Sequence, residues 1–228
     1  MYAKAKSIES IHLNVFTYKL IFPTVFFMKS RFLFVFLLVV LLLNGCATRP
    51  PPPERVETNA LQQKLDQFNA WQLRGRLAFK SEQEKFSANL NWQQIDDTYQ
   101  VKLTSFIGTT LLEMQGAPGE ALILADDQEY RDIDGQRLIH QITGWNIPIN
   151  KLPLWIKGQF APGDAVIFDK QGLVQTLTTG CLFCDRWKIS FQKYQQLDDL
   201  WLPHQVTLVN QDAPDNQIKI RINTWKKT

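Results

Sequence analysis

The stretch that decides the fold is residues 71–92, which read WQLRGRLAFKSEQEKFSANLNW. Apolar side chains alternate with polar ones on both sides of a short charged segment, residues 81–84. Because successive side chains of a strand point to opposite faces, this spacing gives each run one apolar face. The sequence therefore predicts two half-buried antiparallel strands joined by a turn.

The same alternation recurs along the chain, apart from one interruption. Further strands are predicted at residues 99–103, 109–115, 121–125, 165–168, 173–178, 187–194, 202–209 and 218–222. Between residues 135 and 158 the spacing instead favours a short helix broken by Pro148 and a second that ends at Gly158. The predicted fold is mainly β with short α-helices, a strongly curved antiparallel sheet of roughly 11 strands.

A helix is also predicted just before the sheet. Leu61, Leu65 and Phe68 fall on one helical face that ends near Asn69, and Thr58 or Asn59 is expected to cap its start.

Upstream lies a segment with the layout of an export signal. Lys29 and Arg31 precede an uncharged run, residues 32–43, which is shorter than the ~20 apolar residues of a membrane-spanning helix. Residues 43–46, Leu-Asn-Gly-Cys, resemble the lipobox of bacterial lipoproteins, so Cys46 is expected to carry lipid and residues 1–45 to be removed. Met28 is expected to be the true start. The alternative is an uncleaved anchor with a coincidental cysteine.

The residue after the cysteine bears on location. In lipoproteins that this leader resembles, an Asp at that position retains the protein in the inner membrane, and here it is Ala47. The outer membrane is therefore expected.

The remaining chain divides into a tether and one domain. Residues 46–57 contain four consecutive prolines, Pro50 to Pro53, which favour a semi-rigid extended spacer. Residues 58–228 are long enough for a single domain with a real core. From Cys46 onward there are 20 basic and 21 acidic side chains, and this balance argues against nucleic-acid binding.

An enzyme is not expected. The sequence has no nucleophile elbow, zinc-protease motif or phosphate-binding glycine loop, so no catalytic residue, cofactor or metal site is predicted. The pair Cys181 and Cys184 has the Cys-x-x-Cys spacing of redox sites, but the motif is predicted at a hairpin tip without a following helix. A structural disulfide or spectator thiols are the other interpretations.

Several motifs resemble the outer-membrane lipoprotein receptor family LolB, over residues 71–225. They are Arg74-Gly75-Arg76-Leu77-Ala78-Phe79, Trp92-Gln93-Gln94, Gly108-Thr109, Gly144-Trp145-Asn146-Ile147-Pro148-Ile149, Leu154-Trp155-Ile156-Lys157-Gly158, Trp187-Lys188 and the closing residues 218–225.

The resemblance implies an incomplete antiparallel β-barrel with a helical lid over an apolar cavity. It also implies a function: a monomer, anchored at the periplasmic face of the outer membrane, that accepts lipoproteins from the carrier LolA and inserts them among the outer-membrane lipids. The alternative is a non-enzymatic lipoprotein scaffold for envelope assembly.

Candidates for the acyl cavity follow from strand alternation and from the expected lid. They are Phe86, Leu90, Trp92, Trp155, Ile156, Trp187, Ile189, Ile220 and Ile222. For each residue taken alone, a place in an ordinary packed core is the competing interpretation.

The loop Phe106-Ile107-Gly108 is unusually apolar for a turn. In the LolB family an exposed apolar residue follows a proline and precedes the glycine of this loop. That residue aligns with Ile107, whereas Phe106 stands where the proline would be. We expect a membrane-insertion loop; the alternative is that both side chains fold back onto the core.

Overall fold

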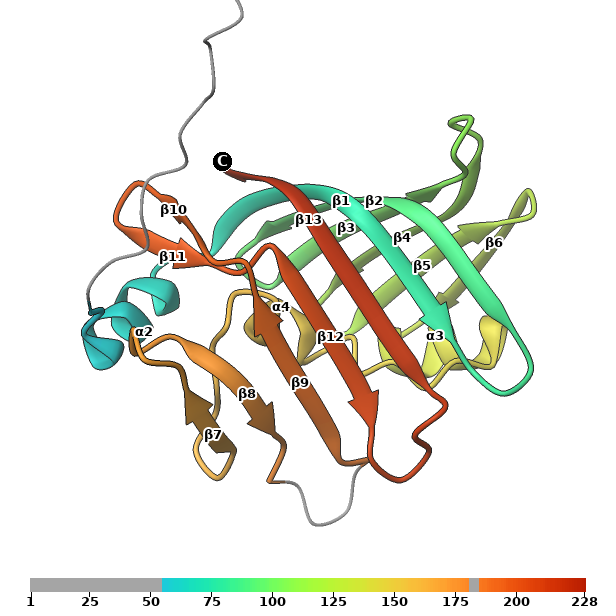
Figure 1. Cartoon of the computed structure of the whole chain (residues 1–228). Helices are drawn as coiled ribbons and strands as arrows, with labels where there is room; N and C mark the ends of the chain where they lie inside the picture. Colours follow the sequence, from blue (N-terminus) through green and yellow to red (C-terminus); the bar gives the residue numbers. More distant parts are fainter. Residues whose placement is uncertain (1–54, 181–184) are drawn as a thin grey trace, which may run out of the picture. The chain divides into compact units, whose positions relative to one another are not determined.

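The computed structural model describes residues 55–180 and 185–228, which belong to one compact unit. Eleven strands form one antiparallel sheet, in the order β6-β5-β4-β3-β2-β1-β13-β12-β9-β8-β7 (Figure 1). Their bounds are β1 Ala70–Lys80, β2 Lys85–Ile95, β3 Thr98–Thr104, β4 Thr110–Ala117, β5 Glu120–Ala125, β6 Gln128–Asp132, β7 Ala165–Phe168, β8 Val174–Thr178, β9 Trp187–Gln192, β12 Gln205–Asn210 and β13 Gln217–Lys227. The predicted mainly β architecture is confirmed.

Smaller elements complete the fold. A separate hairpin consists of β10 (Gln195–Leu197) and β11 (Leu200–Leu202). The helices are α2 (Thr58–Asp66), α3 (Gly135–Thr143) and α4 (Leu152–Trp155).

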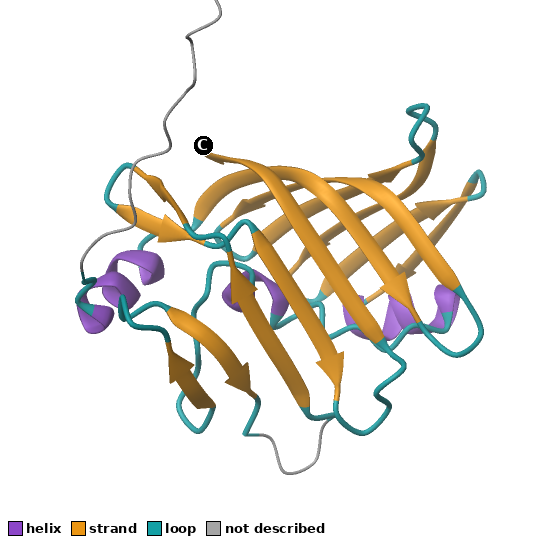
Figure 2. Cartoon of the chain, in the orientation of Figure 1, coloured by secondary structure: helices purple, strands orange, loops and turns teal. Residues whose placement is uncertain are grey.

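The strand order leaves the sheet open. Pairing of β1 with β13 joins a meander of six N-terminal strands to five C-terminal strands, and β6 and β7 remain as the two edges. The chain must pass from one edge to the other, and it does so along the inside of the curved sheet (Figure 2). This connection, residues 133–164, carries α3 and α4, and we call it the lid.

The sheet's inner face and the lid enclose the core. As the alternation predicts, β2 exposes or half-exposes Lys85, Ser87 and Asn89 but buries Ala88 and Leu90. Inner residues of neighbouring strands form continuous rows, such as Ile189, Leu208, Ile218 and Phe79 across β9, β12, β13 and β1. Such cross-strand contacts are the units that stabilise a sheet.

Helix α2 starts differently from the prediction. Its N-cap is Glu57 and makes no side-chain capping bond, while the Thr58 Oγ1 donates to the Gly172 carbonyl at 2.7 Å. The capping role expected of Thr58 or Asn59 is therefore wrong, because Thr58 binds the turn after β7 instead. The helix ends at Asp66, three residues before the predicted end.

The lid ties down the other end of α2. Lys157 donates from Nζ to the carbonyl oxygens of Leu65 (2.9 Å) and Phe68 (3.1 Å), just where α2 ends. The Leu65 carbonyl also accepts from the Phe68 N–H at 3.2 Å. Burial lowers the pKa of this amine to about 8, against the attraction of Asp66.

Glycine, rather than proline, ends α3. The helix stops at Thr143, and Gly144 adopts φ 71°, a left-handed cap that costs glycine little. Trp145 consequently lies outside the helix, and the termination assigned to Pro148 is wrong. The predicted second helix also stops early, at Trp155, before the left-handed Gly158.

Two strand predictions also need correction. The run 202–209 is interrupted at Pro203, which has no N–H to donate to a ladder, so β11 and β12 are separate strands. The prediction lacks β6, because four of its five residues are exposed and it shows no apolar alternation, and it lacks β10, which has only three residues.

A glycine permits the central pairing of β1 with β13. The register of the two strands shifts between Arg74 and Gly75, and a Cβ at Gly75 would lie 2.1 Å from the carbonyl oxygen of Arg221. The two backbones therefore approach closely here, as occurs at bulges in curved sheets.

We predict that Gly75→Ala lowers the free energy of unfolding by about 3 kcal/mol or more, since the obstructing atom belongs to the backbone. Urea denaturation measures this. The control Gly108→Ala meets no atom within 4 Å and incurs only the strain of its φ of 93°, about 1 kcal/mol. Equal losses in the two variants would contradict the steric explanation.

Candidate functional site

An apolar cavity of about 50 Å³ lies between the sheet and the lid. Strands β1 to β4 and β13 form one wall, and α3 with the chain that follows it forms the other. The lining residues are Leu77, Leu90, Trp92, Tyr99, Val101, Leu103, Leu112, Met114, Ile139, Trp145, Ile147, Ile149, Leu152 and Ile220. Such a lining suits a hydrocarbon ligand and offers few groups to a polar one.

The indole nitrogen of Trp92 at the wall is hydrogen-bonded. The Trp92 Nε1–H donates to Gln94 Oε1 at 3.2 Å, and Gln94 in turn donates to the Asp96 carbonyl oxygen at 2.7 Å. Trp92 also packs against Trp71 with ring centroids 5.2 Å apart. Hydrogen bonding of the indole lets its ring face the cavity without an unsatisfied donor.

Tyr99 forms the polar boundary of the cavity. Its ring runs across Gly116 and reaches Gly135 at the start of α3, where an added Cβ would lie 2.4 Å from the hydroxyl oxygen in each case. Burial, and secondarily the charge of Asp134, raises the pKa of this phenol to about 12, so it is neutral at physiological pH.

The cavity is too small for a long acyl chain. Ligand sites typically measure ~300–1,000 Å³, several times the observed volume. Ile147, Ile149 and Leu152 of the lid project into the space that a larger ligand would need. Acyl binding in this cavity therefore requires the lid to move.

The part of the lid that follows α3 is held by an aromatic cluster. Trp145 stacks on Phe79 with centroids 4.4 Å apart and contacts Phe86 at 5.1 Å. Its Nε1–H donates to Glu84 in the β1–β2 turn.

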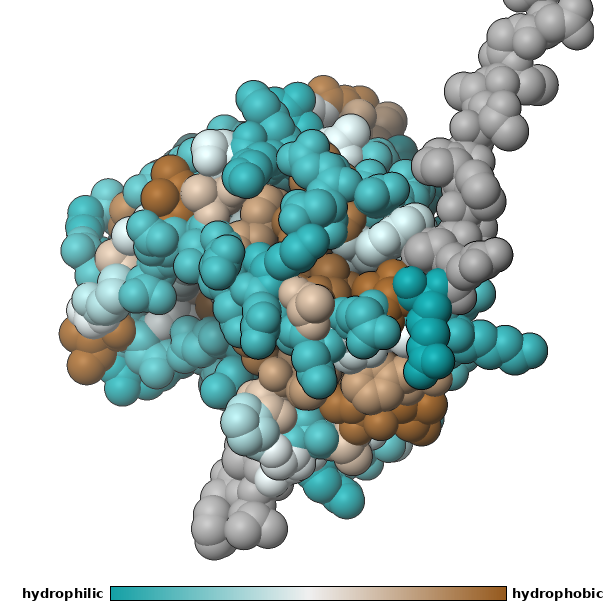
Figure 3. All heavy atoms as spheres, turned by 90° about the vertical axis from the view of Figure 1, so that its left-hand side faces the viewer, coloured by the Kyte–Doolittle hydropathy of each residue, from teal (hydrophilic) through white to brown (hydrophobic). Residues whose placement is uncertain are grey.

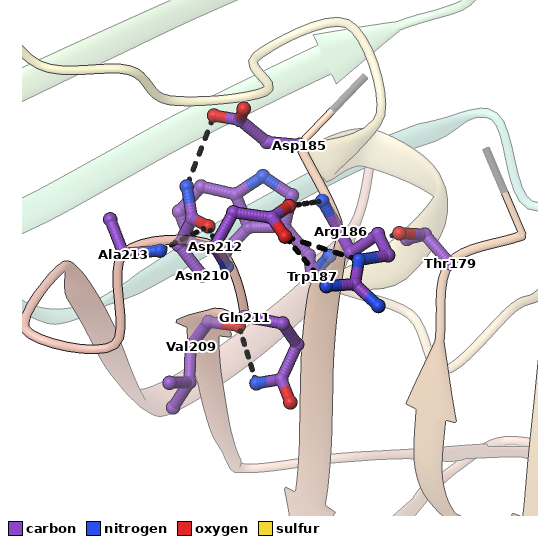
Figure 4. Close-up of polar contacts among 9 residues, drawn as sticks. All are labelled: Thr179, Asp185, Arg186, Trp187, Val209, Asn210, Gln211, Asp212 and Ala213. Carbon is purple, nitrogen blue, oxygen red and sulfur yellow. Dashed lines mark hydrogen bonds and ion pairs between the residues drawn. The ribbon is translucent and has the colours of Figure 1, made fainter. Parts of the chain in front are cut away.

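The next lid residue, Asn146, contacts a polar network at the start of β9 and the end of β12; Figure 4 shows this network without Asn146. Asn146 donates to the carboxylate of Asp185, which also accepts from Asn210 Nδ2 at 3.0 Å. Arg186 and Asp212 brace this network: Arg186 donates from Nη2 (2.7 Å) and Nε (3.1 Å) to the same oxygen, Oδ1, of Asp212. These contacts are polar and close to solvent, so they exchange for water more readily than the buried core does.

The structure distributes the predicted cavity residues over several places. Leu90, Trp92 and Ile220 lie on the cavity wall, and Phe86 lies behind it against Trp145. Their binding role stays a prediction.

Trp155 and Trp187 instead line a separate, partly polar hollow of about 630 Å³ between the lid and the residues that follow β8 and begin β9. Ile156, Ile189 and Ile222 are buried but lie outside the cavity lining, because this part of the inner face is filled by its own packed side chains.

Sequence reasoning missed the walls contributed by β4 and the lid. Leu112, Met114, Ile147 and Ile149 line the cavity, yet only their apolar character is visible in the sequence. The cavity residues of β3 could have been identified from the sequence, since Tyr99, Val101 and Leu103 alternate with polar residues within a predicted strand.

The apolar loop between β3 and β4 projects into solvent. Phe106 is 88% and Ile107 74% exposed, so neither folds back onto the core. Ser105 fixes the turn: its carbonyl accepts from the Gly108 N–H at 3.0 Å, and its Oγ accepts from the Thr109 N–H at 3.1 Å. The two apolar side chains are therefore presented by an ordered turn.

Three predicted residues, Cys46, Cys181 and Cys184, lie outside the described residues. Within residues 55–180 and 185–228, no three His, Cys, Asp or Glu side chains are placed to hold a metal ion. Over the same ranges, no helix is long and apolar enough to cross a membrane.

Comparison with known proteins assigns the family. Residues 69–225 match the family described as "Outer membrane lipoprotein LolB". The outer-membrane lipoprotein LolB of Shewanella baltica is 36% identical over 199 residues, covering 87% of this chain and 90% of that protein. The LolB protein of Aeromonas hydrophila is 37% identical over 191 residues, covering 83% and 93%.

Among solved structures, a LolA superfamily protein from Nitrosomonas europaea gives a TM-score of 0.48 at 7% identity, covering 76% of this chain and 94% of that one. The family match and the two curated relatives lead to one conclusion: this chain belongs to the outer-membrane lipoprotein LolB family.

Proposed function

We propose that this protein is a lipoprotein receptor of the outer membrane. It accepts the acyl chains of lipoproteins from a LolA-like periplasmic carrier and passes them to the membrane. The observation that carries the proposal is an apolar cavity under a lid, in a body that also displays an ordered apolar loop.

The cavity addresses the main physical obstacle to lipoprotein transport. Each CH₂ exposed to water costs ~0.8 kcal/mol, so several acyl chains cannot cross an aqueous compartment unprotected. Transfer from one apolar site to another avoids this exposure and needs no bound nucleotide, provided that each successive site binds more tightly.

The lid allows an acyl chain to enter the cavity and later to leave it. Ile147, Ile149 and Leu152 occupy the space in the free protein, and an acyl chain would replace their contacts with chemically similar ones. Lid and cargo thus compete for the same wall, and this competition keeps the net affinity low enough for later release.

Anchoring and delivery complete the proposal. Lipid on Cys46 would hold the protein at the periplasmic face of the outer membrane, with residues 46–57 as a spacer. Phe106 and Ile107 would enter the lipid layer and offer cargo a route out. No catalytic step and no cofactor are involved, and a single copy is sufficient.

A scaffold for envelope assembly is the second candidate function. The observation that favours it is exposed apolar surface on edge strand β7, where Ile167 is 60% and Phe168 41% exposed. Figure 3, which shows the side of the body carrying α2 and β7, displays separate hydrophobic areas among hydrophilic ones. A scaffold would not need to take up acyl chains.

Acyl uptake is tested with residues 47–228, which lack the expected lipid site Cys46 and are called the unlipidated body. This protein is titrated with a fluorescent fatty-acid analogue. We predict saturable binding that alters tryptophan emission, because Trp92 and Trp145 line the cavity. Ile147→Ser should bind the analogue about 5- to 30-fold more tightly, because it removes apolar lid contacts that compete with the acyl chain for the wall. Ile133→Ser, at a lid position that is 70% exposed, should bind as wild type does. Absence of binding by the folded wild type would favour the scaffold.

Lipidation is tested by growing cells with labelled palmitate. The wild type should incorporate label, and Cys46→Ala should incorporate none and leave the membrane fraction. The Cys46→Ala body should still accept cargo, since, among the described residues, the core runs from Val56 to Trp225. Equal labelling of wild type and variant would rule out Cys46 as the lipid site.

The insertion role of the loop is tested with Ile107→Glu. This variant should take up cargo normally but deliver it to outer-membrane vesicles at least about 10-fold more slowly, since a charge opposes entry into the apolar layer. The matched control is Ile133→Glu, the same change at another exposed position. Delivery at the wild-type rate by Ile107→Glu, or equal slowing by both variants, would refute the proposed role.

A further inference from the structure

We propose that a polar cleft beside the apolar cavity binds the peptide that follows the acylated terminus of a cargo lipoprotein, and that it favours peptides bearing lysine or arginine. This inference rests on the proposed function and adds a preference for the peptide portion of the cargo.

The cleft lies where α2, the β2–β3 turn and the lid meet. Its volume is about 330 Å³, and its polar lining includes Asp66, Asp96, Asp97, Lys157 and Gln159. The three carboxylates come from two different elements, the end of α2 and the β2–β3 turn. Only the fold brings them together.

The cleft and the cavity share part of their walls. Tyr99 and Ile149 line both hollows, so the two are neighbours on either side of these side chains. A ligand whose acyl chain occupied the cavity would carry its polar portion to this boundary. In a lipoprotein, that polar portion is the peptide attached to the acylated residue.

Charge in the cleft favours a cationic peptide. Three carboxylates face one ammonium group, and Lys157 already donates to Leu65 and Phe68. The carboxylates of Asp96 and Asp97 make no hydrogen bond or ion pair within the described ranges. The hydrogen bonds at Asp96 involve its backbone carbonyl and N–H only. Two negative groups are thus free to pair with an incoming cation.

The side-chain carbonyl oxygen of a buried amide in the same cleft also has no hydrogen-bond donor. Gln159 is only 2% exposed, and its Nε2 donates to Asp66 Oδ1 at 2.6 Å. Its Oε1 has no hydrogen-bond partner in the part of the chain that the structure describes. Exchanging the two amide atoms would set oxygen against the Asp66 carboxylate, so the observed orientation is the favourable one. A buried acceptor without a donor is costly and can be satisfied by an N–H of a bound peptide once the cleft adjusts.

The experiment uses two N-palmitoylated hexapeptides that differ only in three lysines or three glutamates. Binding to the unlipidated body is measured by tryptophan emission at low salt. We expect the lysine peptide to bind about 10-fold more tightly than the glutamate peptide. In 0.5 M NaCl most of this difference in affinity should disappear, because exposed charges are screened over ~10 Å or less. Asp96→Asn/Asp97→Asn should reduce the ratio at least about 3-fold.

The matched control is Asp126→Asn/Asp127→Asn, which makes the same change in net charge at the exposed β5–β6 turn. Asp96, Asp126 and Asp127 all have positive φ, which asparagine also tolerates, so both variants should fold. The control should keep the wild-type ratio. An equal ratio for all three proteins, or equal affinity for both peptides, would overturn the inference and leave the proposed function intact.

Two other outcomes would distinguish a failure of the proposed function from a different role of the cleft. If neither acylated peptide bound, the proposed function would fail and this inference with it. If Asp96→Asn/Asp97→Asn kept the peptide preference but slowed cargo transfer from a LolA-like carrier, the cleft would be a contact for the carrier and the inference would be wrong.

Discussion

The antiparallel pairing of β1 with β13 is the contact on which the rest of the structure depends. Each strand has 11 residues, and the pair joins the N-terminal meander to the C-terminal strands. A pairing between strands so distant in sequence is possible along its full length only because Gly75 admits the carbonyl of Arg221. It also determines which strands become edges. With β1 and β13 in the middle, β6 and β7 lie at the margins, and the connection between them becomes the lid.

The lid explains why the inner face is apolar yet nearly filled. Protein interiors are close-packed, and an empty site large enough for an acyl chain would sacrifice many dispersion contacts. The lid side chains reduce that space to about 50 Å³. The attachments of the lid differ in kind. Trp145 and Lys157 are held at buried or half-buried positions, whereas the exposed Asn146 is held by the carboxylate of Asp185.

Polarity is distributed around the cavity in a way that suits an amphipathic ligand. Hydrocarbon side chains form its walls, the Tyr99 phenol marks its boundary, and carboxylates lie just beyond. The Phe106 and Ile107 side chains lie apart from this boundary, on the loop between β3 and β4. Uptake of an acyl chain and contact with a lipid layer are thus assigned to different parts of the same sheet, which makes them separable by mutation.

The sequence by itself determined the strands, because alternation with a period of two reports directly which side chains share a face. It also indicated the solvent-exposed apolar loop, since Phe106 and Ile107 occupy a turn between two recognisable strands. Sequence reasoning failed at β6, an exposed edge strand without a buried face, and at the ends of α2 and α3. Thr58 bonds the carbonyl of the distant Gly172 instead of capping α2, and Gly144 ends α3 in a left-handed conformation.

Only the tertiary structure decided which apolar residues surround the cavity. Leu90 and Ile189 have the same strand pattern in the sequence, yet one lines the cavity and the other is packed in the core. The difference depends on what lies opposite each residue, and that is set by the course of the lid across the sheet. The polar cleft has the same origin: Asp66 and Asp97 are adjacent only because strand pairing and lid packing bring α2 to the β2–β3 turn. Periodicity assigns a side chain to a face, whereas contacts between distant segments decide whether that face encloses a site.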